Sequence, residues 1–187
     1  MKILVLDNYD SFTYNLVHIL RELGHSSNIE IHRNDKIQLD EVMKFDKILL
    51  SPGPGIPSDA GIMPQLLKEY ASIKSILGVC LGHQAIAENF GGSLKLLETV
   101  KHGVESELHI LNPKGLFEEI PQNMPIGHYH SWYVNETGLP DELEITAKDT
   151  DDIIMSLRHK IYDCTGVQFH PESILTPFGK QMIENWL

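Results

Sequence analysis

Hydrophobic positions fall into short continuous runs in the first half of the chain. Residues 2–6 form a run rich in branched side chains that ends at Asp7, which is typical of a strand buried on both faces of a parallel sheet. Residues 46–50 and 75–79 repeat this pattern, and residues 29–32 alternate between apolar and polar. We therefore expect four strands within the first 80 residues.

Helical patterns lie between these runs. Apolar residues three and four positions apart extend from Leu16 to Leu23, and Gly24 follows as a stop signal. Further helices are expected at 62–71 and from about 82 to 90. Strand–helix alternation implies right-handed crossovers, so the pattern predicts an α/β fold with a mostly parallel central sheet and helices on both faces.

The second half of the sequence has a different pattern, because short predicted strands follow one another without predicted helices between them. These strands are expected to be antiparallel or to extend the sheet. They are predicted at 93–97, 104–110, 126–134, 143–148, 153–158 and 161–169, with a last helix at 177–187. The chain has no repeat, low-complexity segment or linker, so we expect a single domain over residues 1–187.

Composition narrows the class of protein. Asp plus Glu number 26 against 15 for Lys plus Arg, a net charge of -11, which disfavours a nucleic-acid binder. No apolar stretch is long enough for a membrane span or a signal peptide. Cys80 and Cys164 are too few for a disulfide scaffold, so a reduced, cytoplasmic setting is expected.

Cys80 stands between two glycines at a predicted strand-to-helix junction. The pattern Gly78-x-Cys80-x-Gly82 matches the elbow that displays a nucleophile, where glycines permit a tight turn. Such a cysteine lies at a helix N-terminus, where the dipole favours the thiolate and the N–H of Leu81 faces a forming oxyanion. A buried packing cysteine is an equal alternative from this segment alone.

His170-Pro171-Glu172 supplies a base and a group to orient it. Residues two apart in an extended segment point the same way, and Pro171 favours that conformation at His170. Glu172 is therefore expected to fix one tautomer of His170 while the other ring nitrogen faces the sulfur. Taken alone, a chance pair of side chains at a strand end is the alternative.

Ser51-Pro52-Gly53-Pro54-Gly55-Ile56-Pro57 directly follows a predicted strand. Loops at the carboxyl ends of parallel strands meet at one crevice, so this stiff loop is expected beside the elbow, where it can donate an N–H to the oxyanion. By itself the segment also fits an ordinary surface turn. It lacks the Gly-Lys-Ser/Thr ending of a phosphate-binding loop.

Together, Ser51–Gly55, Gly78–Gln84 and Gln168–Ser173 resemble the class I, triad-type glutamine amidotransferases, in the family's order and over nearly the whole chain. The resemblance implies a flavodoxin-like domain. Within the family, the sequence is most similar to the small subunits of anthranilate synthase and of aminodeoxychorismate (para-aminobenzoate) synthase. This similarity lies in Asp7–Asn15, in His130-Ser131 and in the ending at Pro171–Thr176.

The resemblance implies that Cys80 is the nucleophile, His170 the acid/base and Glu172 its orienting partner in L-glutamine hydrolysis to glutamate and ammonia. It implies no cofactor in this subunit. A chorismate-using synthase large subunit, expected to need Mg²⁺, would accept the ammonia. The residues implied to bind glutamine or its oxyanion are Gly53, Pro54, Gly55, Leu81, Gln84, Ser131 and Trp132.

One departure from the family pattern is Trp132, where a leucine is usual. Asp7–Asn15 and Trp132 are candidate parts of the partner interface, although Tyr9, Phe12 and Tyr14 could instead pack under the first helix.

Other readings stay open. We favour a role for this subunit in tryptophan biosynthesis. The alternative is a role in folate biosynthesis, or one subunit that serves both synthases. A γ-glutamyl hydrolase, a cysteine peptidase and a non-catalytic binding subunit are more remote. Cys164 is expected to be a packing residue or an inert surface residue. His83 is expected to be structural, with contact to the site as the alternative, and Asp149–Asp152 is expected to form a solvated turn.

Overall fold

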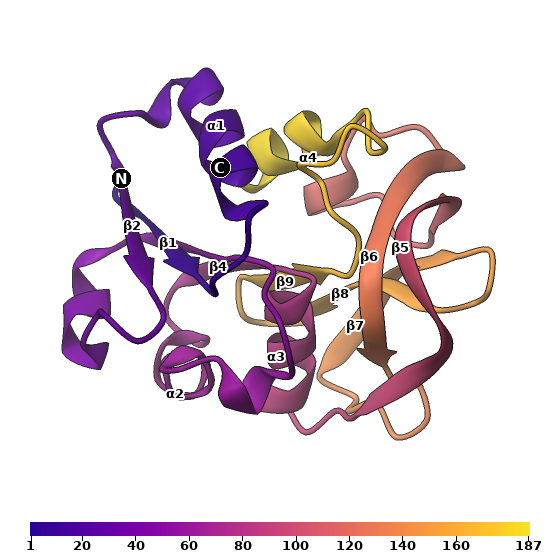
Figure 1. Cartoon of the computed structure of the whole chain (residues 1–187), viewed down its shortest axis with the longest axis horizontal. Helices are drawn as coiled ribbons and strands as arrows, with labels where there is room; N and C mark the ends of the chain where they lie inside the picture. Colours follow the sequence, from indigo (N-terminus) through magenta and orange to yellow (C-terminus); the bar gives the residue numbers. More distant parts are fainter.

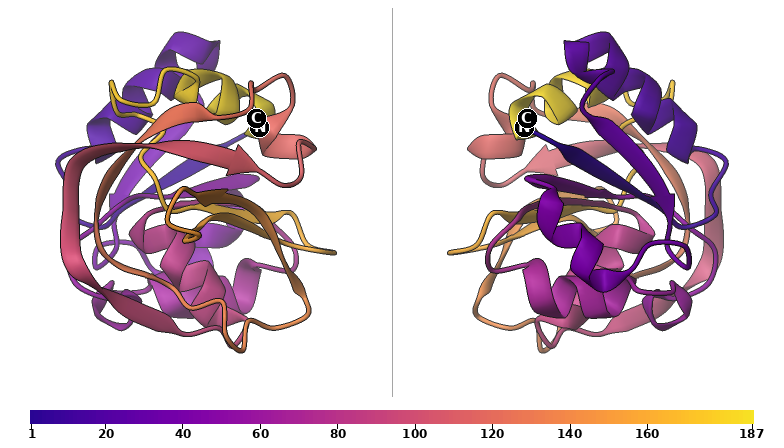
Figure 2. Two further views of the ribbon diagram at one scale, coloured as in Figure 1. Left: turned by 90° about the vertical axis from the view of Figure 1, so that its right-hand side faces the viewer. Right: turned by 90° about the vertical axis from the view of Figure 1, so that its left-hand side faces the viewer.

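The computed structural model describes residues 1–187, and nine strands form one curled sheet at its centre (Figures 1 and 2). The strand order is β2-β1-β3-β4-β9-β8-β7-β5-β6. The strands are β1 (Ile3–Asp7), β2 (Ile29–Arg33), β3 (Lys47–Leu50), β4 (Ser75–Val79), β5 (Leu94–Ile110), β6 (Met124–Val134), β7 (Leu143–Asp149), β8 (Ile154–His159) and β9 (Cys164–Val167).

The sheet has a parallel half and an antiparallel half. β2, β1, β3, β4 and β9 pair in parallel, with crossovers between them. β8, β7, β5 and β6 continue the sheet through antiparallel pairs, and the long strands β5 and β6 form its strongly curved far end (Figure 2). The predicted α/β class, with antiparallel strands added in the second half, is confirmed.

Helices cover both faces of the parallel half. In Figure 1, α1 and α4 lie on one face and α2 and α3 on the other. Alternation along β1 explains the two layers, because Ile3 and Val5 pack into one core while Leu4 and Leu6 pack into the other. The helices are α1 (Thr13–Leu20), α2 (Met63–Tyr70), α3 (Leu81–Asn89) and α4 (Gly179–Trp186), with short helical turns η1 (Arg21–His25), η2 (Leu39–Lys44), η3 (Pro57–Asp59) and η4 (Gly115–Phe117).

β5 corrects one detail of the predicted pattern. The segments 93–97 and 104–110, predicted as separate strands, belong to one 17-residue strand. Its pairing with β6 shifts register twice, and Gly103 adopts a positive φ of 66° at the second shift. Such bulges interrupt the alternation of side chains. Most of residues 94–107 are also exposed, so no continuous apolar run indicates the full length.

Two element ends also differ from the pattern. The first helix turns into the wider η1 before Gly24, and β9 begins at Cys164, later than predicted. The residues before β9 form a turn instead, in which the N–H groups of Ile161 and Tyr162 donate to Nδ1 of His159 at 3.1 and 2.9 Å. None of the helices has the length and apolar character needed to cross a bilayer.

Candidate active site

Three predicted motifs meet at the carboxyl edge of the parallel strands. Strand register places Leu50 of β3 beside Gly78 of β4, and Gly78 beside Gly166 of β9. The chain therefore leaves all three strands at nearly the same level. The Ser51–Pro57 loop, Cys80 and the segment to His170 follow directly, so the predicted gathering of these segments at one edge is confirmed.

Cys80 is held in a strained turn between β4 and α3. Its φ of 51° and ψ of −97° are a conformation that side chains rarely adopt, and its N–H donates to the Val167 carbonyl at 2.8 Å. A Cβ on Gly78 would lie 2.5 Å from the Gly82 backbone, and one on Gly82 would lie 2.7 Å from Leu50. The glycines thus allow close approach, and the strain points to a displayed nucleophile more than to a packing cysteine.

His170 has an orienting partner but also a free nitrogen. Nδ1 lies 2.6 Å from Glu172 Oε1, and both side chains are almost fully buried. Nε2 is buried and makes no hydrogen bond of normal geometry. Phe12 and Tyr129 pack against the imidazole at centroid distances of 5.4 and 4.9 Å, which fixes its plane. Geometry therefore leaves Nε2 available for the neighbouring Cys80.

The electrostatics of His170 favour the imidazolium. Burial alone would lower its pKa, but interactions with Cys80 and Glu172 outweigh burial and raise the pKa to about 10. At neutral pH the ring is thus a proton donor toward the sulfur side. This is the charge state that suits a cysteine nucleophile paired with a histidine.

The raised pKa of His170 predicts a pH-dependent stability. The folded pKa lies above the ordinary value, so its stabilising contribution is complete below about pH 6.5 and is lost as pH rises toward 10. Glu172→Gln removes one of the two groups that raise the pKa. Urea unfolding from pH 6 to 9.5 should therefore show wild type losing more stability than the variant. Parallel curves would contradict the assignment.

A cavity of about 270 Å³ opens beside Cys80 and collects most of the predicted binding residues. Its lining residues are Gly53, Pro54, Gly55, Cys80, Gln84, Val100, His102, Tyr129, His130, Ser131 and Trp132. Leu81 does not line it, because its side chain is buried, although its N–H belongs to the first turn of α3, where such groups lack helical partners. A larger cavity of about 450 Å³ near α4 contains no cysteine.

The Ser51–Gly55 loop is fastened by Asn8 at the end of β1. The Asn8 N–H donates to Ser51 Oγ at 2.9 Å, and its side-chain amide donates to the Ser51 carbonyl at 2.8 Å. A Cβ on Gly53 would lie 2.6 Å from that of Asn8. Asn34 in turn donates to the Asn8 side-chain oxygen at 3.0 Å. These contacts hold the Gly53 backbone against the cavity.

Several residues of the site escape prediction from the pattern. Gln168 is fully buried and its amide nitrogen lies 3.5 Å from Cys80 Sγ. His128 and His130 are buried on β6, and His130 lines the cavity. Gln168 and His130 fall within segments that resemble the family, but nothing in the pattern gives either side chain a role. The alternation of 128, 130 and 132 on one strand face does not distinguish a buried polar face from a solvated one.

His83 and Cys164 are buried, whereas Asp149 departs from the expected solvated turn. His83 is fully buried against Gly166, and burial lowers its pKa to about 3. Burial also raises the pKa of the Cys164 thiol, as expected for an inert cysteine. The solvated-turn prediction is wrong for Asp149, which is buried because Lys101 pairs with it at 2.9 Å.

The aromatic residues near the N-terminus divide between packing and surface. Phe12 packs on the imidazole of His170, whereas Tyr9 and Tyr14 are exposed. Packing under the first helix therefore does not account for these two tyrosines. Tyr9 lies in the loop between β1 and α1, and Tyr14 lies in the first turn of α1.

Comparisons with known proteins agree with this arrangement. The family model "Glutamine amidotransferase class-I" matches residues 4–187. Aminodeoxychorismate/anthranilate synthase component 2 of Bacillus subtilis is 43% identical over 187 residues, covering 99% of this chain and 95% of that protein. Anthranilate synthase component 2 of Cyanophora paradoxa is 44% identical over 188 residues, covering 99% and 97%.

Two further matches differ in length or similarity. The bifunctional protein TrpGD of Thermotoga maritima is 44% identical over 188 residues, and the match takes in all of this chain but only 32% of that protein. The crystal structure of a glutamine amidotransferase from Thermotoga maritima superposes with a TM-score of 0.75 at 14% identity, covering 100% of this chain and 96% of that one. This last likeness concerns the fold.

Proposed function

The chain belongs to the class-I glutamine amidotransferase family, and we propose that it hydrolyses L-glutamine at Cys80 and passes the ammonia to a chorismate-using synthase subunit. The observation that carries the proposal is the juxtaposition of a strained, displayed Cys80 with the His170–Glu172 pair at 2.6 Å, beside a cavity of amino-acid size. A merely structural cysteine requires none of these features.

The proposed reaction begins with attack of the Cys80 thiolate on the side-chain amide carbon of glutamine. The N–H groups of Gly53 and Leu81 stabilise the tetrahedral oxyanion, each contributing about 3 kcal/mol to lowering the barrier. The imidazolium of His170 gives its proton to the leaving ammonia, and a thioester remains. His170 then takes a proton from water as it attacks, which releases glutamate and restores Cys80. Glu172 holds the ring in one orientation throughout.

The polar walls of the cavity fit the other end of the substrate. Gly55, Gln84, Ser131 and Trp132 line it and are proposed to hold the α-amino and α-carboxylate groups, and Pro54 stiffens the adjoining loop. The side-chain nitrogen of Gln84 donates to the Trp132 carbonyl at 2.9 Å, so the Gln84 oxygen is available to a cationic amine. The proposed steps use the side chains of this subunit and water, without a cofactor.

Ammonia requires an acceptor, and the relatives' names point to a chorismate-using synthase. We favour the anthranilate synthase large subunit and tryptophan biosynthesis. Aminodeoxychorismate synthase and folate biosynthesis are the second candidate, because the Bacillus subtilis relative carries both names. The synthase subunit is expected to use Mg²⁺. The free cysteines are consistent with a cytoplasmic setting.

The partner surface is proposed to include residues 7–15 and Trp132. Tyr9 is 47% exposed and Tyr14 is 61% exposed, and large aromatic side chains of this kind are enriched at protein interfaces. The same segment contributes Phe12, which contacts His170. A docked subunit could therefore act on the catalytic ring through one side chain.

Reconstitution with each candidate large subunit tests the proposal. The chain should release glutamate from glutamine in the complex, and the product formed from chorismate should identify the pathway: anthranilate, aminodeoxychorismate or both. Glutaminase activity without either product would support glutamine hydrolysis by this subunit and would reject a chorismate-using synthase as its partner. Cleavage of γ-glutamyl peptides in preference to glutamine would reject the proposed substrate.

A further inference from the structure

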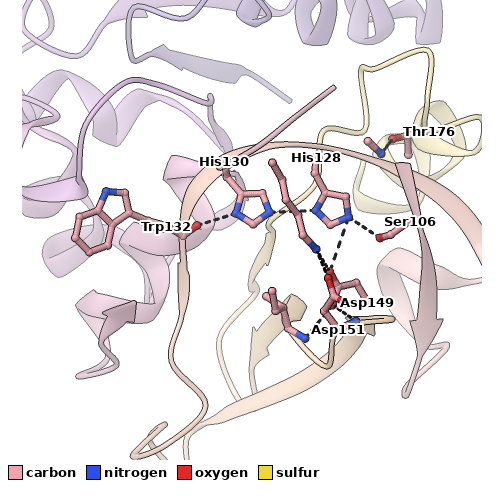
Figure 3. A network of polar contacts seen from close by, with 10 residues as sticks. Ser106, His128, His130, Trp132, Asp149, Asp151 and Thr176 are labelled. Atoms are coloured by element: carbon pink, nitrogen blue, oxygen red, sulfur yellow. Dashed lines mark hydrogen bonds and ion pairs between the residues drawn. The ribbon is translucent and has the colours of Figure 1, made fainter. Parts of the chain in front are cut away.

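A buried chain of polar side chains runs from the cavity into the antiparallel half of the sheet (Figure 3). The carbonyl of Trp132 lies 2.9 Å from Nδ1 of His130, and Nε2 of His130 lies 3.1 Å from Nδ1 of His128. Nε2 of His128 contacts the hydroxyl of Ser106 on β5. The Trp132 indole points away from these hydrogen-bonded side chains, so only the Trp132 carbonyl takes part.

The direction of each hydrogen bond in the chain is determined. Burial lowers the pKa of both His128 and His130 to about 4, so each ring is neutral at pH 7 and carries a single N–H. A carbonyl only accepts, so His130 donates from Nδ1 to Trp132 and must accept at Nε2. His128 therefore donates from Nδ1 and accepts at Nε2, where the Ser106 hydroxyl donates. Every proton points toward Trp132.

The outer end of the chain keeps His128 neutral. Asp149 Oδ2 lies 3.9 Å from His128 Nε2, and an unpaired carboxylate there would attract a proton onto the ring. Lys101 instead binds Asp149 at 2.9 Å and Asp151 at 2.8 Å. The ammonium group compensates the buried carboxylate and also lowers the pKa of His128.

The inner end reaches the nucleophile. The Trp132 carbonyl also accepts from Gln84 Nε2 at 2.9 Å, so Gln84 and His130 occupy both of its lone pairs. Gln84 Nε2 donates its second hydrogen to Gln168 at 3.1 Å, and Gln168 contacts the sulfur of Cys80 at 3.5 Å. With both hydrogens of Gln84 in use, its oxygen is the group left to face a ligand.

We propose that His130 and His128 are positioning residues for the amino-acid end of the substrate. They hold the Trp132 carbonyl, which holds the Gln84 amide with its oxygen toward the α-ammonium group of the bound ligand. His130 does not need to touch the reacting amide for this role. The inference rests on the proposed function, since it names the residues that prepare the same cavity for an α-amino acid.

Two amide substitutions distinguish this role from simple packing. In His130→Asn the amide nitrogen falls where Nδ1 lies, so the bond to Trp132 is retained. In His130→Gln the amide falls nearer to Nε2, so that bond is lost although a larger side chain fills the space. The probe is Cys80 alkylation by 6-diazo-5-oxo-L-norleucine, compared with 6-diazo-5-oxohexanoate, the same electrophile without the α-amino group.

The measured quantity is the ratio of the two alkylation rate constants, which reports recognition of the amine. His130→Asn should keep the wild-type ratio, and His130→Gln should lower it about tenfold, as expected for loss of one hydrogen bond to a charged group. An unchanged ratio in His130→Gln, or an equal fall in both variants, would overturn the proposal. Failure of wild type to react, or to prefer the amine-bearing reagent, would instead reject the proposed function.

Ser106→Ala keeps the test valid if His130→Gln does not fold. Removing this hydroxyl takes away only the donor to His128 Nε2 and leaves the β6 residues unchanged. His128 is then free to take the other tautomer, so the ratio should fall about threefold, less than for direct loss of the bond to Trp132. A ratio equal to wild type in folded Ser106→Ala would count against the chain's role.

Discussion

Cys80→Ser should abolish glutamine-dependent synthesis while ammonia-dependent synthesis by the complex continues. Serine retains the elbow but replaces the thiolate with a hydroxyl, which stays protonated at neutral pH and is therefore a much weaker nucleophile. Loss of the nucleophile is expected to lower glutamate release by about 10⁴-fold or more. Parallel assays with glutamine and with ammonium salts measure the two activities.

Cys164→Ser is the matched control, because it makes the same chemical change at the other cysteine. Cys164 is fully buried in the core on the α2 and α3 face and does not line the cavity beside Cys80. The control should lower stability by about 1 kcal/mol or more through burial of a hydroxyl, with little effect on glutamate release. Normal glutamate release by Cys80→Ser would refute the nucleophile assignment, and loss of ammonia-dependent synthesis would indicate a damaged complex.

Much of the fold could be predicted because local patterns and topology agree. Continuous apolar runs at 2–6, 46–50 and 75–79 become β1, β3 and β4, since strands covered on both faces carry no polar alternation. Parallel order then brings the ends of these strands together, so the positions of Cys80 and His170 follow from sequence spacing combined with general topology.

The antiparallel half was harder to predict for a physical reason. β5 is mostly exposed and bulged, so neither burial nor alternation marks its length. The buried chain of His128 and His130 depends on which strand faces which, and the ion pair between Lys101 and Asp149 joins residues 48 positions apart. Local composition around Asp149 indicates a solvated turn, and only the long-range lysine makes its burial favourable.

Strain at Cys80 could be inferred only in part. The glycine pattern indicates a tight turn, but it does not reveal that Cys80 itself takes the positive φ. Similarly, Phe12 belongs to a recognisable segment, but its contact with His170 depends on how α1 approaches the carboxyl edge of the sheet. Both features arise from tertiary packing, so they require coordinates.

Gly82→Ala should destabilise the protein, although helix propensity alone predicts the opposite. Gly82 lies in the first turn of α3, where alanine would gain up to about 1 kcal/mol. Its Cβ, however, would lie 2.7 Å from both the Cβ and the carbonyl oxygen of Leu50, which belongs to the central strand β3. Neither backbone can shift without disturbing the sheet, so we expect a net loss of about 3 kcal/mol.

The sign of the change decides between the two effects, and thermal unfolding measures it. A loss of about 3 kcal/mol corresponds to a fall in Tm of about 6–12 °C for a chain of this size. Gly138→Ala is the matched control: Gly138 has a φ of 80° but nothing within 4 Å of its Cβ, so only backbone strain of about 1 kcal/mol is expected. A Tm for Gly82→Ala equal to or above wild type would show that α3 can move off β3. The close approach that displays Cys80 would then not depend on glycine.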